Sequence, residues 1–239
     1  MGASLSLLYM IRHGQASFGQ GRYDRLSETG SAQAEILGDY FRDSGMKFHF
    51  ACSGEMSRQK ETGRIALSRM DSGATDLELS IVSAFNEYDA DEVIRRQMNQ
   101  MVAEDPRMAE DFTKFFTDNH SFQRVLSRAL WGWVSGALDT TGMESWEEFK
   151  NRVWSGICRI REEYRGGKTV VVFTSGGAIT VATGLALGLP DNATVNLIFQ
   201  IANASVTVFR YDRDRFTLSS FNETAHLHMR ADPRLVTHR

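Results

Sequence analysis

Apolar and polar residues alternate along the chain with two different periods, and each period predicts one kind of element. Short runs rich in apolar and β-branched residues predict strands over 5–11, 48–52, 77–83 and 169–173. Apolar side chains that recur every three or four residues predict helices over 57–70, 145–165 and 178–187, and one more between 26–30 and Gly45. In that first helix, Leu37, Tyr40 and Phe41 share one face. Strands and helices follow one another in turn, which favours an α/β fold.

Residues 91–140 break this alternation. Met, Phe and Trp residues are mixed there with charged ones, which predicts a helical insertion over the sheet. We expect its aromatic side chains to form a packing seam, although a few could line a pocket instead. Further on, 205–211 and 216–221 predict a hairpin at the sheet edge. The whole pattern predicts one domain over 1–239, with three α/β/α layers around a mostly parallel sheet and the 91–140 insertion as a cap.

Composition narrows the classes of function. The chain has 239 residues and a formal net charge of -3 at pH 7, so no overall basic field attracts nucleic acid. Any anion site must therefore be a local group of Arg and His residues. The two cysteines, Cys52 and Cys158, suit neither a disulfide framework nor a zinc site and predict reduced thiols in a cytoplasmic protein. Neither a membrane-spanning run nor a secretory leader is expected.

The candidate chemistry begins where the first predicted strand ends. The strand stops at Arg12-His13-Gly14, which places a guanidinium suited to phosphate beside a possible nucleophile. Gly14, followed by Gln15, lets a backbone come close to a ligand. An ordinary polar turn at the end of a strand is the alternative interpretation of these residues.

Two further segments point to an anion. After the central strand, Ser175-Gly176-Gly177 forms a turn that opens a helix, where free backbone N–H groups suit a negative charge. Ligands of open α/β sheets bind at the carboxyl ends of strands, where the two turns would meet. Arg58 lies in the first turn of its predicted helix, where the helix dipole disfavours a cation. An anionic partner would explain this position, and a solvated surface arginine is the alternative.

These residues occur in an order that resembles the histidine phosphatase superfamily, in its phosphoglycerate-mutase-like branch. The motifs that carry the resemblance are Arg12-His13-Gly14, residues 26–34, Ser53 with Arg58 and Thr62, Glu87, residues 142–145 with Arg152, residues 203–206 and residues 221–227. They cover nearly the whole chain. Each motif alone is unspecific, but their combination in this order is specific, and it implies a phosphoglycerate-mutase-like fold.

The resemblance implies phosphoryl transfer through a phosphohistidine. His13 would be the nucleophile, and it must stay neutral to attack phosphorus. Arg12 and Arg58 would bind the phosphoryl oxygens, where charge gathers in the transition state. Gly14 and Gln15 would lie on the substrate side of the site.

Glu87 would protonate the leaving oxygen and then deprotonate a water molecule, which requires a carboxyl pKa raised toward neutrality. A surface carboxylate on a loop is the alternative for Glu87. The resemblance requires no metal and no other cofactor. The expected partner is a small phosphorylated substrate or inorganic phosphate, without nucleic acid or membrane, and exposed apolar residues of the insertion permit a homodimer.

The chain departs from the family at one position. The family has a second histidine in the turn after the central strand, where this chain has Ser175 beside Gly176 in a phosphate-binding position. Losing one charged transition-state donor commonly costs about 10²–10³ in rate, so we expect Ser175→His to raise the rate. His226 and His228 could supply the missing group, although structural roles are the favoured interpretation of both.

Three functions are compatible with these residues. The favoured one is a phosphomonoester hydrolase that works through His13 and is slow or specialised because of Ser175. A phospholigand-binding protein that has lost turnover is the alternative. A phosphoglycerate mutase is the least favoured, because a mutase needs a dedicated pocket that keeps water from its phosphoenzyme.

Overall fold

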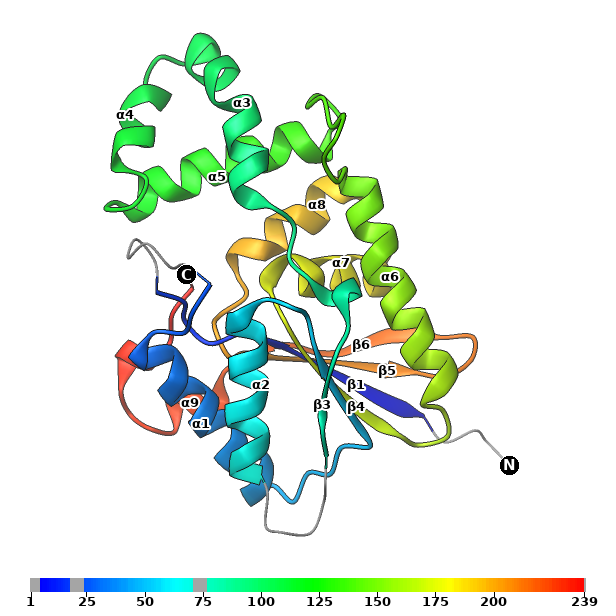
Figure 1. Cartoon of the computed structure of the whole chain (residues 1–239). Helices are drawn as coiled ribbons and strands as arrows, with labels where there is room; N and C mark the ends of the chain where they lie inside the picture. Colours follow the sequence, from blue (N-terminus) through cyan, green and yellow to red (C-terminus); the bar gives the residue numbers. More distant parts are fainter. Residues whose placement is uncertain (1–4, 18–23, 71–76, 239) are drawn as a thin grey trace.

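A six-stranded sheet lies at the centre of the computed structural model, which describes residues 5–17, 24–70 and 77–238 (Figure 1). Its strands are β1 (Ser6–Arg12), β2 (Phe50–Ser53), β3 (Leu79–Ile81), β4 (Thr169–Thr174), β5 (Val206–Tyr211) and β6 (Phe216–Glu223). Their spatial order is β3-β2-β4-β1-β5-β6. The first four strands in the chain pair in parallel, whereas β5 pairs antiparallel with both β1 and β6. The predicted mostly parallel sheet is confirmed.

Helices cover both faces of the sheet, as Figure 1 shows. The helices are α1 (Glu28–Asp43), α2 (Ser57–Met70), α6 (Trp146–Glu163) and α7 (Gly176–Leu187), with the short α8 (Asp191–Asn196) and α9 (Ala225–His228). Successive side chains of β1 point to opposite faces of the sheet, so this strand contributes to the apolar core on both sides. Leu8 and Met10 belong to the apolar cluster that includes residues of α6 and α7, while Ile11 belongs to the cluster that includes residues of α1 and α2. The three-layer α/β/α architecture is confirmed.

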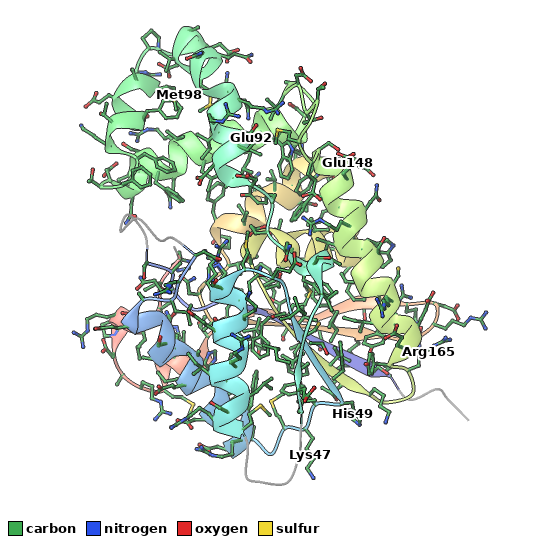
Figure 2. The ribbon with its side chains drawn as sticks, viewed as in Figure 1. Lys47, His49, Glu92, Met98, Glu148 and Arg165 are labelled. Carbon is green, nitrogen blue, oxygen red and sulfur yellow. The ribbon has the colours of Figure 1, made fainter. Side chains whose placement is uncertain are left out.

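Local sequence signals set where the long helices begin. Ser27 is the N-cap of α1, and its side chain accepts the backbone N–H of Gly30. Ser145 and Glu148 form a capping box at α6: Glu148 N–H donates to Ser145 Oγ at 3.2 Å, and Ser145 N–H donates to Glu148 Oε2 at 2.8 Å. Figure 2 labels Glu148 at this end of α6.

The segment for which we predict a helical insertion forms three helices at one end of the molecule (Figure 1). They are α3 (Ala90–Glu104), α4 (Met108–Lys114) and α5 (Asn119–Val134). The ring of Trp133 is buried against Tyr88 and Trp146, with centroids 4.9 and 5.3 Å apart. Trp133 therefore belongs to a packing seam, as predicted, whereas Met98 (Figure 2) and Phe116 are 39% and 62% exposed. The single-domain boundary of 1–239 stays a prediction.

Three predicted boundaries are wrong by a few residues. The strand expected over 77–83 contains only Leu79–Ile81, because Ser83–Phe85 turns into a short 3-10 helix, η1. The strand expected from Phe48 begins at Phe50, and Phe48 instead packs its ring edge-on against Phe41 at 5.2 Å. Helix α7 begins at Gly176 rather than at residue 178, because the glycine turn is itself the first helical turn. Two further 3-10 turns, η2 (Leu197–Phe199) and η3 (Pro233–Leu235), lie in segments for which no element is predicted.

Candidate active site

The candidate site forms where β1 and β4 end side by side. Arg12 pairs with Thr174 in the parallel register, and the N–H of His13 donates to Thr174 O at 2.8 Å. The carbonyl of His13 accepts from Asn203 Nδ2 at 3.2 Å and from the N–H of Ala204 at 3.3 Å. Only 3% of His13 is exposed. The two strand ends therefore meet at one edge, as the sequence predicts.

Hydrogen bonds at both ring nitrogens orient the His13 imidazole. Its Nδ1 lies 2.7 Å from Gly14 O, and since a carbonyl only accepts, Nδ1 carries the proton and donates it. Nε2 then holds a lone pair, to which the Arg58 Nε–H donates at 3.1 Å. The ring is held as the tautomer whose Nε2 can act as a nucleophile.

Burial and two arginines keep this imidazole neutral. Desolvation lowers the pKa of His13 well below the ordinary histidine value, and the positive charges of Arg58 and Arg12 lower it further. The hydrogen bond to Gly14 O raises the pKa, but it is the smallest of these effects. A neutral side chain at neutral pH follows from these contacts.

Gly14 is needed because the loop after β1 approaches α1 closely. A side-chain carbon on Gly14 would lie 2.3 Å from Gly30 O, and one on Gly30 would lie 2.1 Å from Gln15 O. Backbone atoms cannot move aside as the end of a flexible side chain can. The N–H of Gly14 also donates to Thr62 Oγ1 at 3.0 Å, which itself donates to Arg58 O at 2.7 Å. The Thr62 hydroxyl thus joins the histidine loop to the helix that carries Arg58.

Gln15 faces the start of α1. Ser27 Oγ donates to Gln15 Oε1 at 2.9 Å, and the N–H of Ser27 donates to Gln15 O at 2.9 Å. The N–H of Gln15 donates to Gln33 Oε1 at 2.7 Å. These contacts give Gln15 a structural role at the N-terminus of the helix, and its expected position on the substrate side stays a prediction.

The Arg12 side chain is held by two carbonyl groups far away in the sequence. Its Nη1 donates to Ile201 O and to His238 O, the latter at 3.3 Å. Gly176 lies beside the same guanidinium, since a carbon at the Cβ position of Gly176 would be 3.9 Å from Arg12 Nε. Arg12 therefore reaches the first turn of α7, where backbone N–H groups suit an anion.

Arg58 is anchored by an acidic residue that no sequence pattern predicts. Asp24 Oδ1 accepts from Arg58 Nη1 at 3.1 Å, and Asp24 Oδ2 accepts the N–H of Ser57 at 2.9 Å. The Asp24 carboxylate is thus an anion that the first turn of α2 favours. Only 5% of Arg58 is exposed, so the alternative of a solvated surface arginine is wrong.

Glu87 packs against the first turn of α7. The N–H of Gly177 donates to Glu87 Oε2 at 2.9 Å, and the N–H of Tyr88 donates to Oε1 at 3.3 Å. A side-chain carbon on Gly177 would lie 2.2 Å from Glu87 Oε1, so glycine makes room for the carboxyl. Desolvation raises the pKa of Glu87, and the two N–H groups and the nearby arginines oppose this only partly. A carboxyl with a raised pKa can donate a proton.

Arg152 holds the loop that carries Glu87. Its Nε donates to Glu144 Oε1 at 2.6 Å. Its Nη1 donates to three carbonyl groups of the loop, at 3.2, 3.1 and 3.1 Å, which belong to Ser83, Ala84 and Asn86. One guanidinium therefore joins α6 to the segment that positions Glu87, a role that its place in the sequence motif does not predict.

Ser175 is the N-cap of α7 and contacts a buried glutamine. Its Oγ accepts from Gln59 Nε2 at 2.8 Å. Ser175 is 1% exposed and Gln59 is not exposed at all. Along the chain, Ser175 precedes Gly176 and Gly177, which approach Arg12 and Glu87 respectively. No sequence pattern predicts a role for Gln59, since a glutamine beside Arg58 carries no sign that it is buried.

Of the two histidines in the closing segment, His226 is buried against α1 and His228 is exposed. His226 stacks on the ring of Tyr40 of α1 at 5.5 Å and is 4% exposed. Burial lowers the pKa of His226 to about 4, although a hydrogen bond with the backbone of Ala204 opposes this. His228 is exposed at the end of α9. These contacts favour the structural interpretation of both residues.

The described residues hold neither a metal-binding cluster nor a membrane-spanning helix. Within 5–17, 24–70 and 77–238, no three or more His, Cys, Asp or Glu residues are arranged to hold a metal ion. In the same part of the chain, no helix combines the length and the apolar character needed to cross a membrane.

Sequence comparison identifies one family. A sequence model of the histidine phosphatase superfamily (branch 1) matches residues 8–224. A 2,3-bisphosphoglycerate-dependent phosphoglycerate mutase from Parvibaculum lavamentivorans is 32% identical over 90 residues, which are 35% of this chain. The match spans 42% of the length of that relative.

Solved structures share the fold at low sequence identity. A phosphoglycerate mutase from Bacillus anthracis str. Sterne is 24% identical, with a TM-score of 0.68 over 96% of this chain and 98% of that one. A mycobacterial glucosyl-3-phosphoglycerate phosphatase is 20% identical, with a TM-score of 0.63 over 92% and 100%. A phosphoserine phosphatase from Entamoeba histolytica, in complex with 3-phosphoglyceric acid, is 20% identical, with a TM-score of 0.61 over 93% and 99%. These likenesses confirm the phosphoglycerate-mutase-like fold, and with the match over residues 8–224 the chain belongs to the histidine phosphatase superfamily, branch 1.

Proposed function

We propose that this protein hydrolyses phosphomonoesters through a phosphohistidine intermediate on His13. The observation that carries the proposal is the state of the His13 ring. Its Nδ1–H is fixed on Gly14 O, its Nε2 lone pair lies beside the Arg58 guanidinium, and its pKa is held low. A neutral, oriented imidazole next to phosphate-binding groups is what nucleophilic attack on phosphorus requires.

In the first step, His13 Nε2 attacks phosphorus. A P–N bond forms while the P–O bond to the leaving group breaks, and Nδ1 keeps its proton and its hydrogen bond to Gly14 O. Arg12 and Arg58 bind the phosphoryl oxygens, where negative charge gathers. The Arg58 Nε–H, which faces the lone pair of Nε2 in this structure, turns to an oxygen of the substrate. The first N–H groups of α7, at Gly176, add neutral donors.

Glu87 moves the protons in both steps. Its protonated carboxyl gives a proton to the leaving oxygen as the ester bond breaks. The carboxylate then takes a proton from a water molecule that attacks phosphorus, the P–N bond breaks, and inorganic phosphate leaves neutral His13 behind. The raised pKa of Glu87 supports the first of these roles.

We propose that turnover is slow because Ser175 is uncharged. A serine hydroxyl can donate one hydrogen bond to the phosphoryl group but cannot carry a positive charge. Loss of one such donor in a transition state typically costs about 10²–10³ in rate. The remaining groups, Arg12, Arg58 and the start of α7, still provide most of the anion site.

Steady-state hydrolysis of p-nitrophenyl phosphate tests this function. We expect slow but measurable release of p-nitrophenol from the wild-type protein and a loss of about 10³-fold or more in His13→Ala. The exposed His228 provides a matched control, and His228→Ala should keep the wild-type rate. A His13→Ala variant that hydrolyses the ester as fast as wild type would contradict the proposal.

A phospholigand-binding protein without turnover is the second candidate, and Ser175 is the observation that favours it. Such a protein would bind inorganic phosphate or orthovanadate, and Arg12→Ala would weaken that binding. It would release no product from any phosphomonoester. The absence of turnover together with phosphate binding would therefore establish this function instead of hydrolysis.

A phosphoglycerate mutase is the third candidate, and its support is the partial match to a mutase sequence. The two reactions differ in the fate of the phosphoenzyme, which a mutase protects from water. Incubation with 3-phosphoglycerate separates them. Formation of 2-phosphoglycerate would favour the mutase, whereas release of inorganic phosphate favours the hydrolase.

The proposed substrate is a small phosphomonoester. Solved relatives of this fold include phosphatases of phosphoserine and of glucosyl-3-phosphoglycerate. We place the reaction in the cytoplasm, because Cys52 and Cys158 are both free thiols, as expected in a reducing compartment. No metal takes part in the proposed steps, since the arginines and N–H groups provide the charge stabilisation. Homodimerisation of the protein stays a prediction.

A further inference from the structure

We infer that Gln59 is a positioning residue that aims the Ser175 hydroxyl at the phosphoryl group as a hydrogen-bond donor. This inference rests on the proposed phosphate site and deepens it. In this view the glutamine and the serine form a neutral pair that works in place of one histidine. The pair joins α2, which carries Gln59, to the residue between the end of β4 and the start of α7.

The amide of Gln59 has a fixed orientation. Its Nε2 donates to Phe85 O at 3.2 Å, and since a backbone carbonyl can only accept, the atom that faces it is the nitrogen. Thr174 Oγ1 also donates to Phe85 O, at 2.7 Å. Phe85 O therefore has both lone pairs engaged and offers no place for a third donor. The second N–H of Nε2 is directed to Ser175 Oγ, 2.8 Å away.

The orientation of the glutamine decides what the serine can do. Because Gln59 donates, Ser175 Oγ accepts at this contact, and its proton must point away from the amide. Among the described residues, the Ser175 hydroxyl makes no N-cap hydrogen bond to α7 and donates to no other group. The residue is 1% exposed, so bulk water does not surround the hydroxyl. A phosphoryl oxygen in the site is the acceptor that would complete it.

The neighbours of Ser175 place this donor at the phosphate site. The residue directly follows Thr174, the last residue of β4, which pairs with Arg12. The next residue, Gly176, lies beside Arg12, and the one after it, Gly177, donates to Glu87. Ser175 therefore belongs to the same turn as Gly176, a proposed phosphate-binding residue, and as Gly177, which contacts the proposed proton donor Glu87.

The same contact changes the expected effect of a histidine at position 175. In the rotamer of the serine hydroxyl, the first ring carbon of a histidine would occupy the Oγ position, 2.8 Å from Gln59 Nε2. That is well inside the roughly 3.5 Å at which non-bonded heavy atoms make contact. With this contact in place, we expect no gain in rate from Ser175→His alone. The gain should require Gln59→Ala in the same protein, which opens the space that the imidazole needs.

Gln59→Met is the variant that removes the amide and keeps the volume. It also removes the Gln59 Oε1 atom, which is buried without a hydrogen-bond partner among the described residues. Methionine fills the same space without burying an unpaired polar atom, so the variant should fold. Gln97 provides the matched control, because it is also a buried glutamine whose Nε2 donates to two backbone carbonyls, Val93 O and Ala129 O.

The test is a double-mutant cycle on anion binding. Calorimetry with inorganic phosphate and with orthovanadate would compare wild type, Gln59→Met, Ser175→Ala and the double variant. We expect each single variant to weaken binding about 10-fold or more, as for a hydrogen bond to a charged group. We expect the double variant to bind no more weakly than Ser175→Ala, because Gln59 acts only through the serine. Gln97→Met should bind both anions like wild type.

The outcomes separate this inference from the proposed function. Losses that multiply in the double variant, or wild-type binding by Gln59→Met, would overturn the role of Gln59 whether or not the protein turns over substrate. Normal coupling in a protein that hydrolyses no ester would keep Gln59 as a positioning residue and reject the hydrolase. Wild-type protein that binds neither anion would overturn both. In a turnover assay, the protein with both Gln59→Ala and Ser175→His should hydrolyse substrate faster than the protein with Ser175→His alone. A Ser175→His protein that is faster than this double variant would contradict the steric argument.

Discussion

A histidine buried between two arginines binds a proton poorly, and this is the main chemical property of the site. The pKa of His13 is lowered by desolvation first and by the charges of Arg58 and Arg12 next. The opposite holds for Glu87, whose carboxyl pKa desolvation raises. Both shifts suit the proposed mechanism, in which His13 attacks while neutral and Glu87 donates a proton.

These two shifts predict the pH dependence of the rate. The proposed mechanism requires neutral His13, so the rising limb of kcat/KM should lie well below the ordinary histidine pKa of 6.5. It also requires protonated Glu87, so the rate should fall as pH rises through a carboxyl pKa above 4.5. We expect a bell-shaped profile with an optimum on the acidic side. It can be measured with an ester whose leaving group needs a proton.

Glu87→Gln is the control for this profile. The variant should lose most activity toward such an ester and should also lose the falling limb, because the group that titrates there is gone. A profile with an alkaline optimum, or a falling limb that Glu87→Gln leaves in place, would contradict the assignment of proton donor.

At this scale, the sequence predicts residues that are adjacent in the chain better than residues that meet only in space. Arg12, His13 and Gly14 could be identified because they are consecutive. Asp24 and Gln59 could not be identified, because each contacts its partner across a long distance in the sequence. Asp24 accepts from Arg58, and Gln59 donates to Ser175. A glutamine in a helix looks the same in the sequence whether it faces water or a buried hydroxyl.

At the scale of elements, the parallel register of β1 and β4 builds the site. Arg12 and Thr174 are paired, so the loop after β1 and the first turn of α7 start from neighbouring points. The close approach of Gly14 to Gly30 then fixes α1 against that loop. The starts of α1 and α6 were predictable because their capping residues, Ser27 and Ser145, act locally. The short β3 was not, since only the turn into η1, a feature of tertiary packing, ends it at Ile81.

The contact between α9 and α1 predicts a pH dependence of stability. His226 has a pKa of about 4 in the folded protein against an ordinary value of 6.5. The unfolded chain therefore binds the proton more tightly, and the stabilisation from neutral His226 is complete above pH 6.5 and is lost as pH falls toward 4. Between pH 7 and pH 4.5 we expect this residue to account for roughly 2–3 kcal/mol of lost unfolding free energy.

Urea unfolding at both pH values measures this loss. His226→Phe keeps an aromatic ring against Tyr40 but cannot be protonated, so its stability should fall by that much less than the stability of wild type. His228→Gln, on the same helix and exposed, should behave like wild type. Equal losses in His226→Phe and wild type would show that protonation of His226 does not weaken this contact.

At the scale of the whole molecule, the sheet carries the candidate site and the insertion forms a separate layer beside it (Figure 1). The ring of Trp133, in α5, connects the two, because it packs against Tyr88, which directly follows Glu87, and against Trp146 of α6. The α/β pattern and the family motifs were sufficient to predict the architecture. The packing of α3 to α5 was not predictable in detail, because an amphipathic helix specifies which face is buried but not which partner covers it.

The most direct test of the central claim is to find phosphate on His13. Glu87→Gln suits this measurement, since the stabilised p-nitrophenolate anion leaves without a proton from an acid, while attack of water on the phosphoenzyme loses its base. After brief incubation with p-nitrophenyl phosphate and an alkaline quench, mass spectrometry should find the phosphoryl group on the peptide that contains His13, and mild acid should remove it. Hydrolysis of the ester by wild type with the phosphoryl group absent from His13 in both proteins, or found on another residue, would contradict this account.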